Sequence, residues 1–303
     1  MAQVHVGVSG WSYDSWRNGA FFPEGLPRRR ELEYLTRRFN SVEINGSFYS
    51  LLTPQTYENY RDTAPDGFLY AVKGSRFITH AKKLRNVETP LANFLASGVL
   101  RLEDKLGPLL WQFPEMAWEV ARVESFLELL PRDTEEAAKL ARKHDDRVKG
   151  RSSLAVHRRR RIRHALEFRS EHFLTAEVVR LCRRHGVALV FADSGDWPYV
   201  EEITAGFVYV RLHGSPRTYA SSYSGAALDD WAHKVRRWAA GDEPPRPRRV
   251  TDRRPPRRKH RTVYVYFDND HHAHAPRNAR ALAERLGVES PGVEAAVDRR
   301  ESR

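Results

Sequence analysis

Several short apolar runs of this chain end in residues, spaced two apart, whose side chains could do chemistry. These pairs are Glu43 and Asn45, Ala71 and Lys73, Glu167 and Arg169, Arg211 and His213, and Asp268 and Asp270. Side chains two apart on a β-strand lie on the same face. If each run is a strand, the period of two places these pairs together and turns the apolar neighbours Ile44, Val72, Phe168 and Leu212 the other way.

The residue types in these pairs are those of acid–base chemistry. Glu43 and Glu167 could act as general acid and base, and His213 could transfer a proton. Lys73, Arg169 and Arg211 favour an anionic group, because arginine offers a bidentate fork to carboxylate or phosphate. We therefore expect the following residues to be catalytic: Glu43, Lys73, Glu167, Arg211, His213 and Asp270.

A metal ion is an alternative use of the same oxygen and nitrogen atoms. Asp193, Asp270, Glu43, Glu167 and His213 would make a set of ligands for a hard cation. Three cationic side chains would compete with that ion, so we expect no cofactor and no metal ligand, with a divalent metal as the alternative. The cluster of His271, His272 and His274 is attributed to loop composition.

A purely structural interpretation is also open. Buried charges are costly unless they are paired, and ion pairs such as Glu43–Lys73 or Glu167–Arg211 could simply close the end of a barrel. Valine, isoleucine and leucine would fill a barrel interior at lower energetic cost than charged residues. The presence of charged residues at five strand ends therefore favours a functional site.

The elements that position these residues alternate between strands and helices. The predicted strands are Val4–Ser9, Val42–Gly46, Phe68–Lys73, Leu109–Phe113, His164–Phe168, Ala188–Ala192, Val208–Leu212 and Val263–Phe267. The predicted helices are Arg29–Phe39, Pro54–Asp62, Pro90–Leu100, Val120–Leu130, Ala176–His185, Leu228–Ala239 and Pro276–Leu286. Eight such units predict an α/β protein with one (β/α)₈ TIM barrel, whose C-terminal strand ends carry the site. An open doubly wound sheet is less favoured, because no G-x-G-x-x-G follows the first strand. Residues 193–207 leave little room for a helix between the sixth and seventh strands.

The net charge of +12 is confined to two arginine-rich segments. Residues 147–163 carry +8 and residues 243–261 carry +7, so the rest of the chain carries −3. We interpret them as solvated insertions, at about 132–162 and 242–261, in a single domain of residues 1–287. The alternative is that they bind nucleic acid. Residues 288–303 lose periodicity and are predicted to be a disordered tail.

The remaining features concern the compartment. The start of the chain lacks the pattern of a secretory signal, and no apolar run is long enough to cross a bilayer. Cys182 is the single cysteine and cannot form an internal disulfide. We therefore expect a cytoplasmic protein with no membrane partner, in an oligomeric state that the sequence leaves open.

Eight stretches of the chain, in order, resemble one family. They are SGWSYDSW (Ser9–Trp16), FNSVEINGSFY (Phe39–Tyr49), VKGSRFITH (Val72–His80), LGPLLWQFP (Leu106–Pro114), LEFRS (Leu166–Ser170), FADS (Phe191–Ser194), VRLHG (Val210–Gly214) and VYVYFDND (Val263–Asp270). They are similar to the YecE-like family, the domain of unknown function 72, from Val4 to about Leu286. This resemblance implies a TIM barrel and leaves the activity open. The family's usual Asn-Asn-Asp at the last strand end is Asp268-Asn269-Asp270 here, which adds a carboxylate.

Substrate contacts are expected from polar and aromatic residues at or just past the strand ends. They are Trp11, Tyr13, Asn45, Tyr49, His80, Gln112, Arg169, Asp193, Tyr219 and Asn269. Aromatic rings there could stack on a sugar or a base. The favoured function is an enzyme acting on a small anionic or carbohydrate-like substrate, with hydrolase, lyase and isomerase classes open. The alternatives are a nucleic-acid binding or processing protein that uses the arginine-rich loops, and a non-catalytic scaffold.

Overall fold

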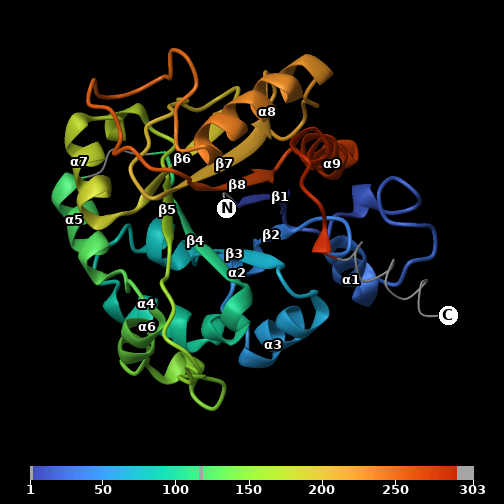
Figure 1. Cartoon of the computed structure of the whole chain (residues 1–303). Coiled ribbons are helices and arrows are strands. Elements are labelled where there is room, and N and C mark those ends of the chain that lie inside the picture. Colours follow the sequence, from blue (N-terminus) through green and yellow to red (C-terminus); the bar gives the residue numbers. More distant parts are fainter. Residues whose placement is uncertain (1–2, 116–118, 292–303) are drawn as a thin grey trace.

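Eight parallel strands close into a barrel in chain order, with helices around it (Figure 1). This is a computed structural model, and it describes residues 3–115 and 119–291. β1 pairs with β8, from Val4 beside Val263 to Val8 beside Phe267, which completes the closure. The predicted TIM barrel is confirmed. In the described part of the chain, no helix has the length and apolar character needed to cross a membrane.

The observed elements follow the predicted order. The strands are β1 (Val4–Ser9), β2 (Ser41–Ile44), β3 (Leu69–Lys73), β4 (Leu106–Gln112), β5 (His164–Glu167), β6 (Ala188–Ser194), β7 (Phe207–Gly214) and β8 (Thr262–Phe267). The helices are α1 (Glu31–Thr36), α2 (Gly46–Tyr49), α3 (Pro54–Thr63), α4 (Glu88–Ala96), α5 (Val120–Leu129), α6 (Thr134–Ala141), α7 (Ala176–His185), α8 (Gly225–Ala239) and α9 (His274–Leu286). Each predicted element overlaps an observed one, whereas α2 and α6 were not predicted.

The apolar residues form two separate cores because side chains alternate along each strand. One core lies between the strands and the helices and contains Ile44, Val72 and Leu212. The other lies inside the barrel, where Ala71 and Tyr209 belong to a group of alanines, tyrosines and a few larger aliphatic residues. The inward and outward assignments made from the period of two are therefore correct at these positions.

The β6–β7 connection has no helix, as its length indicated. The second arginine-rich segment packs against it instead. Glu201 donates its backbone N–H to the carbonyl of Arg248 at 2.7 Å. The buried carboxylate of Glu202 accepts the backbone N–H groups of Val250 at 2.8 Å and Thr251 at 3.0 Å. This segment is a mostly exposed loop, as expected, and these hydrogen bonds anchor it to the barrel.

The first arginine-rich segment is docked in a similar way. Part of the predicted insertion is the helix α6, whose N-terminus is capped by Asp133. Thr134 donates its N–H to the carbonyl of Arg160 at 3.0 Å, and Ile162 donates to the carbonyl of Arg132 at 2.9 Å. Of the predicted tail, residues 288–291 continue from α9, and residues 292–303 lie outside the described residues.

Candidate active site

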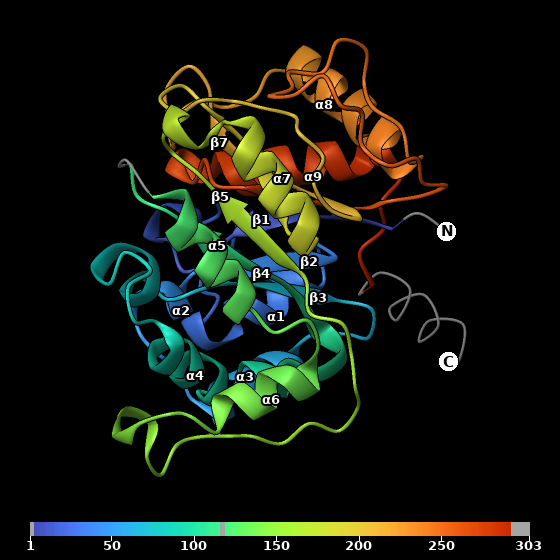
Figure 2. The ribbon, with the colours of Figure 1, turned by 90° about the vertical axis from the view of Figure 1, so that its left-hand side faces the viewer.

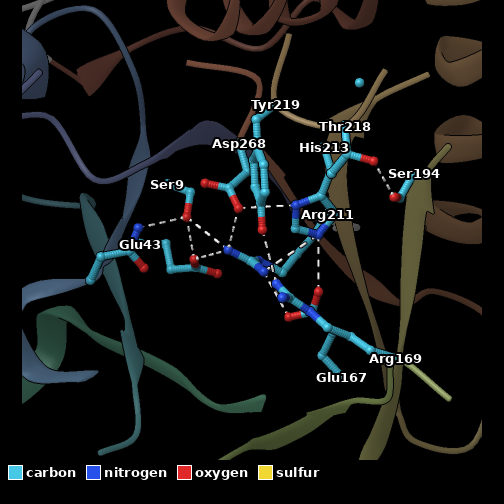
Figure 3. Close-up of polar contacts among 12 residues, drawn as sticks. Ser9, Glu43, Glu167, Arg169, Ser194, Arg211, His213, Thr218, Tyr219 and Asp268 are labelled. Atoms are coloured by element: carbon cyan, nitrogen blue, oxygen red, sulfur yellow. Dashed lines mark hydrogen bonds and ion pairs between the residues drawn. The ribbon is translucent and has the colours of Figure 1, made fainter. Parts of the chain in front are cut away.

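The guanidinium group of Arg211, on β7, is completely buried and holds three carboxylates (Figure 3). Its Nη1 lies 2.7 Å from Oε2 of Glu167, and its Nη2 lies 2.8 Å from Oε1 of Glu43 and 2.9 Å from Oδ2 of Asp268. Nη2 also donates to Oγ of Ser9 at 2.9 Å. We call these five residues, with His213, the Arg211 cluster.

The cluster lies at the C-terminal end of the barrel. Ser9 is the last residue of β1, Glu167 is the last residue of β5, and Asp268 directly follows β8. Because all strands are parallel, these ends meet at one mouth, where TIM barrels carry their active sites. One layer deeper, the hydroxyl of Tyr209 donates to Oε2 of Glu43 at 2.6 Å. The cluster therefore forms the uppermost layer of the barrel interior.

His213 lies between two of the carboxylates. Its Nε2 is 3.0 Å from Oε1 of Glu167, and its Nδ1 is 3.0 Å from Oδ2 of Asp268. The hydrogen bond runs between Nε2 and Glu167, whereas Nδ1 is buried without a hydrogen-bond partner among the described residues. The rings of Trp197 and Tyr219 stand edge-on to it, at centroid distances of 4.9 and 5.7 Å. The arrangement places the imidazole ring between two carboxylates and beside two aromatic rings.

The cluster stabilises negative charge despite its burial. Burial alone would raise the pKa of Glu167 and Asp268, but the Arg211 guanidinium and the hydrogen bond from His213 outweigh it. The pKa of Glu167 lies well below its usual range, and that of Asp268 is lowered to about 2. Both carboxyl groups are therefore ionised at neutral pH.

Lys73 is a second cation at the mouth, and it is not paired. It ends β3, is 7% exposed, and places its ammonium group 4.2 Å from the ring centroid of Phe48. Among the described residues no ion pair joins it to a carboxylate, so the expected Glu43–Lys73 pair is absent, whereas the expected Glu167–Arg211 pair is present. Burial and the charge of Arg211 lower the pKa of Lys73 to about 8. An appreciable fraction of this amine is therefore neutral near pH 7.5.

The structure gathers four predicted contact residues beside the cluster. A cavity of about 340 Å³ is lined by Gly10, Trp11, Ser12, Tyr13, Asn45, Gly46, Tyr49 and Tyr60. Nδ2 of Asn45 donates to Oγ of Ser9 at 3.0 Å, which connects this cavity to the Arg211 cluster. Oδ1 of Asn45 is buried and has no hydrogen-bond partner among the described residues. The cavity therefore offers an amide oxygen and aromatic rings to a ligand.

Three more predicted residues lie on the other side of the cluster. Nη2 of Arg169 donates to the hydroxyl of Tyr219 at 3.0 Å, and its guanidinium carbon lies 3.7 Å from the ring centroid of Trp197. Gln112 ends β4 and pairs in register with Glu167. Together they extend the mouth from Glu167 toward the segment after β7.

His80 is held near the same mouth by a π-helical turn at Phe77–Ala81. Its Nδ1 lies 2.8 Å from Oγ1 of Thr79, and its ring stands edge-on to Phe48 at 5.1 Å. Burial and the charges of Lys73 and Arg169 lower the pKa of His80 to about 4. His80 is therefore a neutral ring beside the two cations.

Three predicted site residues are not joined to the cluster. Asp193 accepts a hydrogen bond from the hydroxyl of Tyr223 at 2.7 Å and lines a different cavity, because its neighbour Ala192 takes the inward position. Nδ2 of Asn269 donates to the carbonyl of Ser221 and to Oδ1 of Asn278, both at 2.9 Å. Asn269 therefore fastens α9 to the segment before α8.

Asp270 also lies apart from the cluster in the described part of the chain. Its backbone carbonyl accepts Nε1 of Trp16 at 3.0 Å, and burial and the charge of Asp268 raise the pKa of its carboxyl group. Arg211 binds the carboxylate of Asp268 instead. Asp268 and Asp270 share the inward row, but Asp268 lies closer to the end of β8. Ser9, Tyr209 and Asp268 were not predicted, although each lies on the inward side of its strand.

No set of three or more histidine, cysteine, aspartate or glutamate side chains, within residues 3–115 and 119–291, is arranged to hold a metal ion. The oxygen atoms at the mouth face the guanidinium group of Arg211 instead. The divalent metal considered from the sequence stays a prediction.

The stability of the protein should fall at acid pH more steeply because of Asp268. A carboxyl group whose folded pKa is depressed contributes stability above its unfolded pKa and loses it as the pH falls toward the folded value. For Asp268 this window runs from about its usual value down to about 2. We expect this carboxylate to contribute about 2 kcal/mol to the free energy of unfolding at pH 6. In urea unfolding measured from pH 6 to pH 2, the free energy of unfolding should fall less steeply with pH in Asp268→Asn than in the wild type. Equal slopes in the two proteins would contradict the lowered pKa of Asp268.

The fold and this mouth define a class: a TIM-barrel protein with a buried arginine–carboxylate–histidine cluster at its C-terminal mouth. The chain belongs to the family described as "Protein of unknown function DUF72", which matches residues 5–302. The resemblance seen in the sequence is therefore confirmed.

Relatives of known sequence or structure agree with this assignment. The UPF0759 protein YecE of Escherichia coli K12 is 28% identical over 131 residues, which span 42% of this chain and only 44% of that protein. A DUF72 family protein of Thermotoga maritima MSB8 superposes with a TM-score of 0.69 at 22% identity, covering 94% of this chain and 99% of that one. A second, from Enterococcus faecalis V583, gives 0.62 at 15% identity over 95% and 98%. At such identities the solved structures establish the shared fold.

Proposed function

We propose that this protein is an enzyme that carries out acid–base chemistry on a small anionic or carbohydrate-like substrate at the C-terminal mouth. The observation that carries the proposal is the Arg211 cluster, which brings ionised carboxylates and His213 together in a buried layer. Titratable groups with displaced pKa values concentrate at functional sites. The proposal leaves the hydrolase, lyase and isomerase classes open.

The roles follow from which groups are already paired. Arg211 already pairs with three carboxylates, so its part is to hold them in place. Lys73 and Arg169 have no carboxylate partner among the described residues and are the cations that would bind an anionic substrate group. His213, between two carboxylates, is the candidate proton carrier. Lys73 in its neutral form is a candidate base.

The aromatic surroundings favour a substrate with a ring or a polyol chain. Trp11, Tyr13 and Tyr49 line the cavity beside Asn45, and Trp197 and Tyr219 flank His213 on the other side. Amphipathic aromatic rings pack against the apolar faces of sugars while polar groups bind the hydroxyls.

The experiment measures binding first and chemistry second. We would titrate the protein by calorimetry with glucose 6-phosphate, glucuronate, inorganic phosphate and glucose at millimolar concentrations. We expect at least one anionic compound to bind, and Arg169→Gln to weaken its affinity about tenfold or more, since a charge-assisted hydrogen bond contributes about 1.5–3 kcal/mol. Arg257→Gln, which removes the same charge at the opposite end of the barrel, should leave the affinity unchanged.

Chemistry would be detected as exchange of carbon-bound hydrogen of the bound compound in D₂O, followed by NMR. His213→Gln should slow this exchange by about 10²–10⁴-fold, the usual contribution of a positioned acid or base. Binding without exchange would exclude proton abstraction from carbon and leave the hydrolase class and the scaffold interpretation. If no anion binds and Arg169→Gln has no effect, the proposal is wrong.

A further inference from the structure

Two arginine-lined cavities lie at the end of the barrel opposite the mouth. One, the β5 cavity, has a volume of about 390 Å³ and includes Arg132, Arg159, Arg160, Arg161, His164 and His185 in its lining. The other, the β8 cavity, has a volume of about 460 Å³ and includes Arg254, Arg257, Arg258 and Arg261. The arginine-rich segments precede β5 and β8, so both return to the side where strands begin (Figure 2).

The carboxylates in these linings are already neutralised. Asp133 pairs with Arg159 at 2.7 Å in the β5 cavity. In the β8 cavity Asp242 pairs with Arg237, and Glu243 pairs with Arg249 at 2.8 Å. The other seven arginines of the two linings form no ion pair with any residue that the structure describes. Both cavities therefore present positive charge that nothing in the described chain compensates.

Each cavity also contains a side chain with unused hydrogen-bonding groups. Arg261 is only 2% exposed, and its Nη2 donates to the carbonyl of Pro256 at 2.7 Å. Its Nε and Nη1 have no partner among the described residues, and neither has either ring nitrogen of His185 in the β5 cavity. Burial and the charge of Arg258 lower the pKa of Arg261. An anion beside these groups would supply the missing acceptors.

The two cavities are connected through the end of α7. Nη2 of Arg183 donates to the carbonyl of Arg253, next to the β8 cavity, at 3.0 Å. Arg183 stands two residues before His185, which lines the β5 cavity. The segments are also held in place: a Cβ atom at Gly241 would lie 1.8 Å from the carbonyl oxygen of Arg258, so the two backbones touch there. A backbone that is already held in place loses less conformational entropy on binding.

We propose that the two cavities form one binding surface for the phosphate backbone of double-stranded nucleic acid. Of the seventeen basic residues in the two segments, fifteen are arginine, whose planar fork fits a phosphate group. A ligand that reaches both cavities must carry repeated phosphates. The contacts are to the backbone, so the binding is independent of base sequence.

The surroundings of the cavities favour a duplex over other polyanions. Tyr49, at the mouth, is the exposed large hydrophobic residue in the described part of the chain. At the opposite end, the described residues therefore form no aromatic platform of the kind that stacks unpaired bases. Nor does the described part of that surface expose large apolar side chains, with which peripheral proteins enter a bilayer.

The test is fluorescence anisotropy with a short labelled DNA duplex at several salt concentrations. The logarithm of the affinity should fall linearly with the logarithm of salt, by about 0.9 for each neutralised phosphate. The triple variant Arg254→Gln, Arg257→Gln, Arg258→Gln should weaken binding about tenfold or more and reduce the slope by about two to three. A second triple variant, Arg132→Gln, Arg160→Gln, Arg161→Gln, should have a similar effect.

The matched control removes the same charge at the other end of the barrel. Arg29, Arg85 and Arg217 are exposed and lie in segments that follow strands. Their triple replacement by glutamine should leave both affinity and slope unchanged, and unchanged melting temperatures would show that all variants fold. An equal loss in the control would overturn the proposal in favour of net charge alone. Tighter binding of the single strand, or binding to phosphatidylserine vesicles without binding to the duplex, would overturn it as well.

Discussion

Replacement of Arg211 by methionine should lower the free energy of unfolding at neutral pH by about 3–5 kcal/mol, the effect of removing one partner from a buried ion pair. Methionine fills much of the same space but leaves Glu43, Glu167 and Asp268 without their shared guanidinium group. These carboxylates are almost completely buried. The loss should therefore come from uncompensated charge and from three missing hydrogen bonds.

The pH dependence of this variant separates lost charge from lost packing. Without Arg211, burial dominates and raises the folded pKa of Glu167 and Asp268 above the unfolded value. A raised pKa contributes stability below the unfolded value and loses it as the pH rises. Arg211→Met should therefore be most stable near pH 4, whereas the wild-type protein gains stability from pH 4 to pH 7. Urea unfolding at pH 4 and pH 7 measures these opposite changes in the free energy of unfolding.

Two further variants complete the experiment. Arg280→Met removes one partner of an exposed pair with Glu284, at 2.9 Å, and should change stability little. Arg211→Lys keeps the charge but offers a single nitrogen in place of two, so it should fall between the wild type and Arg211→Met. If Arg211→Met unfolds like Arg280→Met at neutral pH, the Arg211 cluster does not hold the barrel mouth together.

The second large effect is expected at Glu202, which fastens the arginine-rich segment to the barrel. Its buried carboxylate accepts from Arg183 at 2.5 Å and from the backbone of Val250 and Thr251. Glu202→Leu would leave these donors without an acceptor, and we expect a loss of about 2–4 kcal/mol, since each unsatisfied group costs about 1–3 kcal/mol. Glu202→Gln keeps one acceptor oxygen and should lose less.

Hydrogen exchange followed by mass spectrometry localises this effect. The amides of Val250 and Thr251 should exchange faster in Glu202→Leu, because their hydrogen bonds end at that carboxylate. Peptides from β2 and β3, on the far side of the barrel, should be unchanged. Uniformly faster exchange would mean that the whole barrel is destabilised, and unchanged exchange at both amides would contradict the docking of this segment.

Much of the mouth could be predicted because its residues lie inside strands. Glu43, Glu167, Arg211 and His213 were assigned inward from the period of two, and the structure joins them in one cluster. Residues just beyond a strand were harder to predict, since the period holds only while the backbone stays extended. Asp268 and Asp270 share the same row, but the chain turns after Phe267 and only Asp268 reaches Arg211.

Contacts between distant elements were also out of reach. Asp193 follows Ala192, which faces into the barrel, so its own side chain lies on the other side of β6, where it meets Tyr223. Asn269 turns toward Asn278 on α9. The docking of the arginine-rich segments depends on Glu202, a buried acid in a connection that has no helix. Composition predicted exposed loops at these segments, but it contains no information about the partner that anchors the second one to the barrel.

The sequence by itself determined the order of strands and helices, the closed barrel they form, and the side chains that point into it. These are consequences of local periodicity, which acts over a few residues. Only the tertiary structure decided that Glu43 pairs with Arg211, 168 residues away, and leaves Lys73 without a carboxylate. It likewise decided which groups anchor the basic segments to the barrel. Such partnerships depend on the register and closure of the barrel, which bring together groups whose separation along the chain carries no signal of their contact.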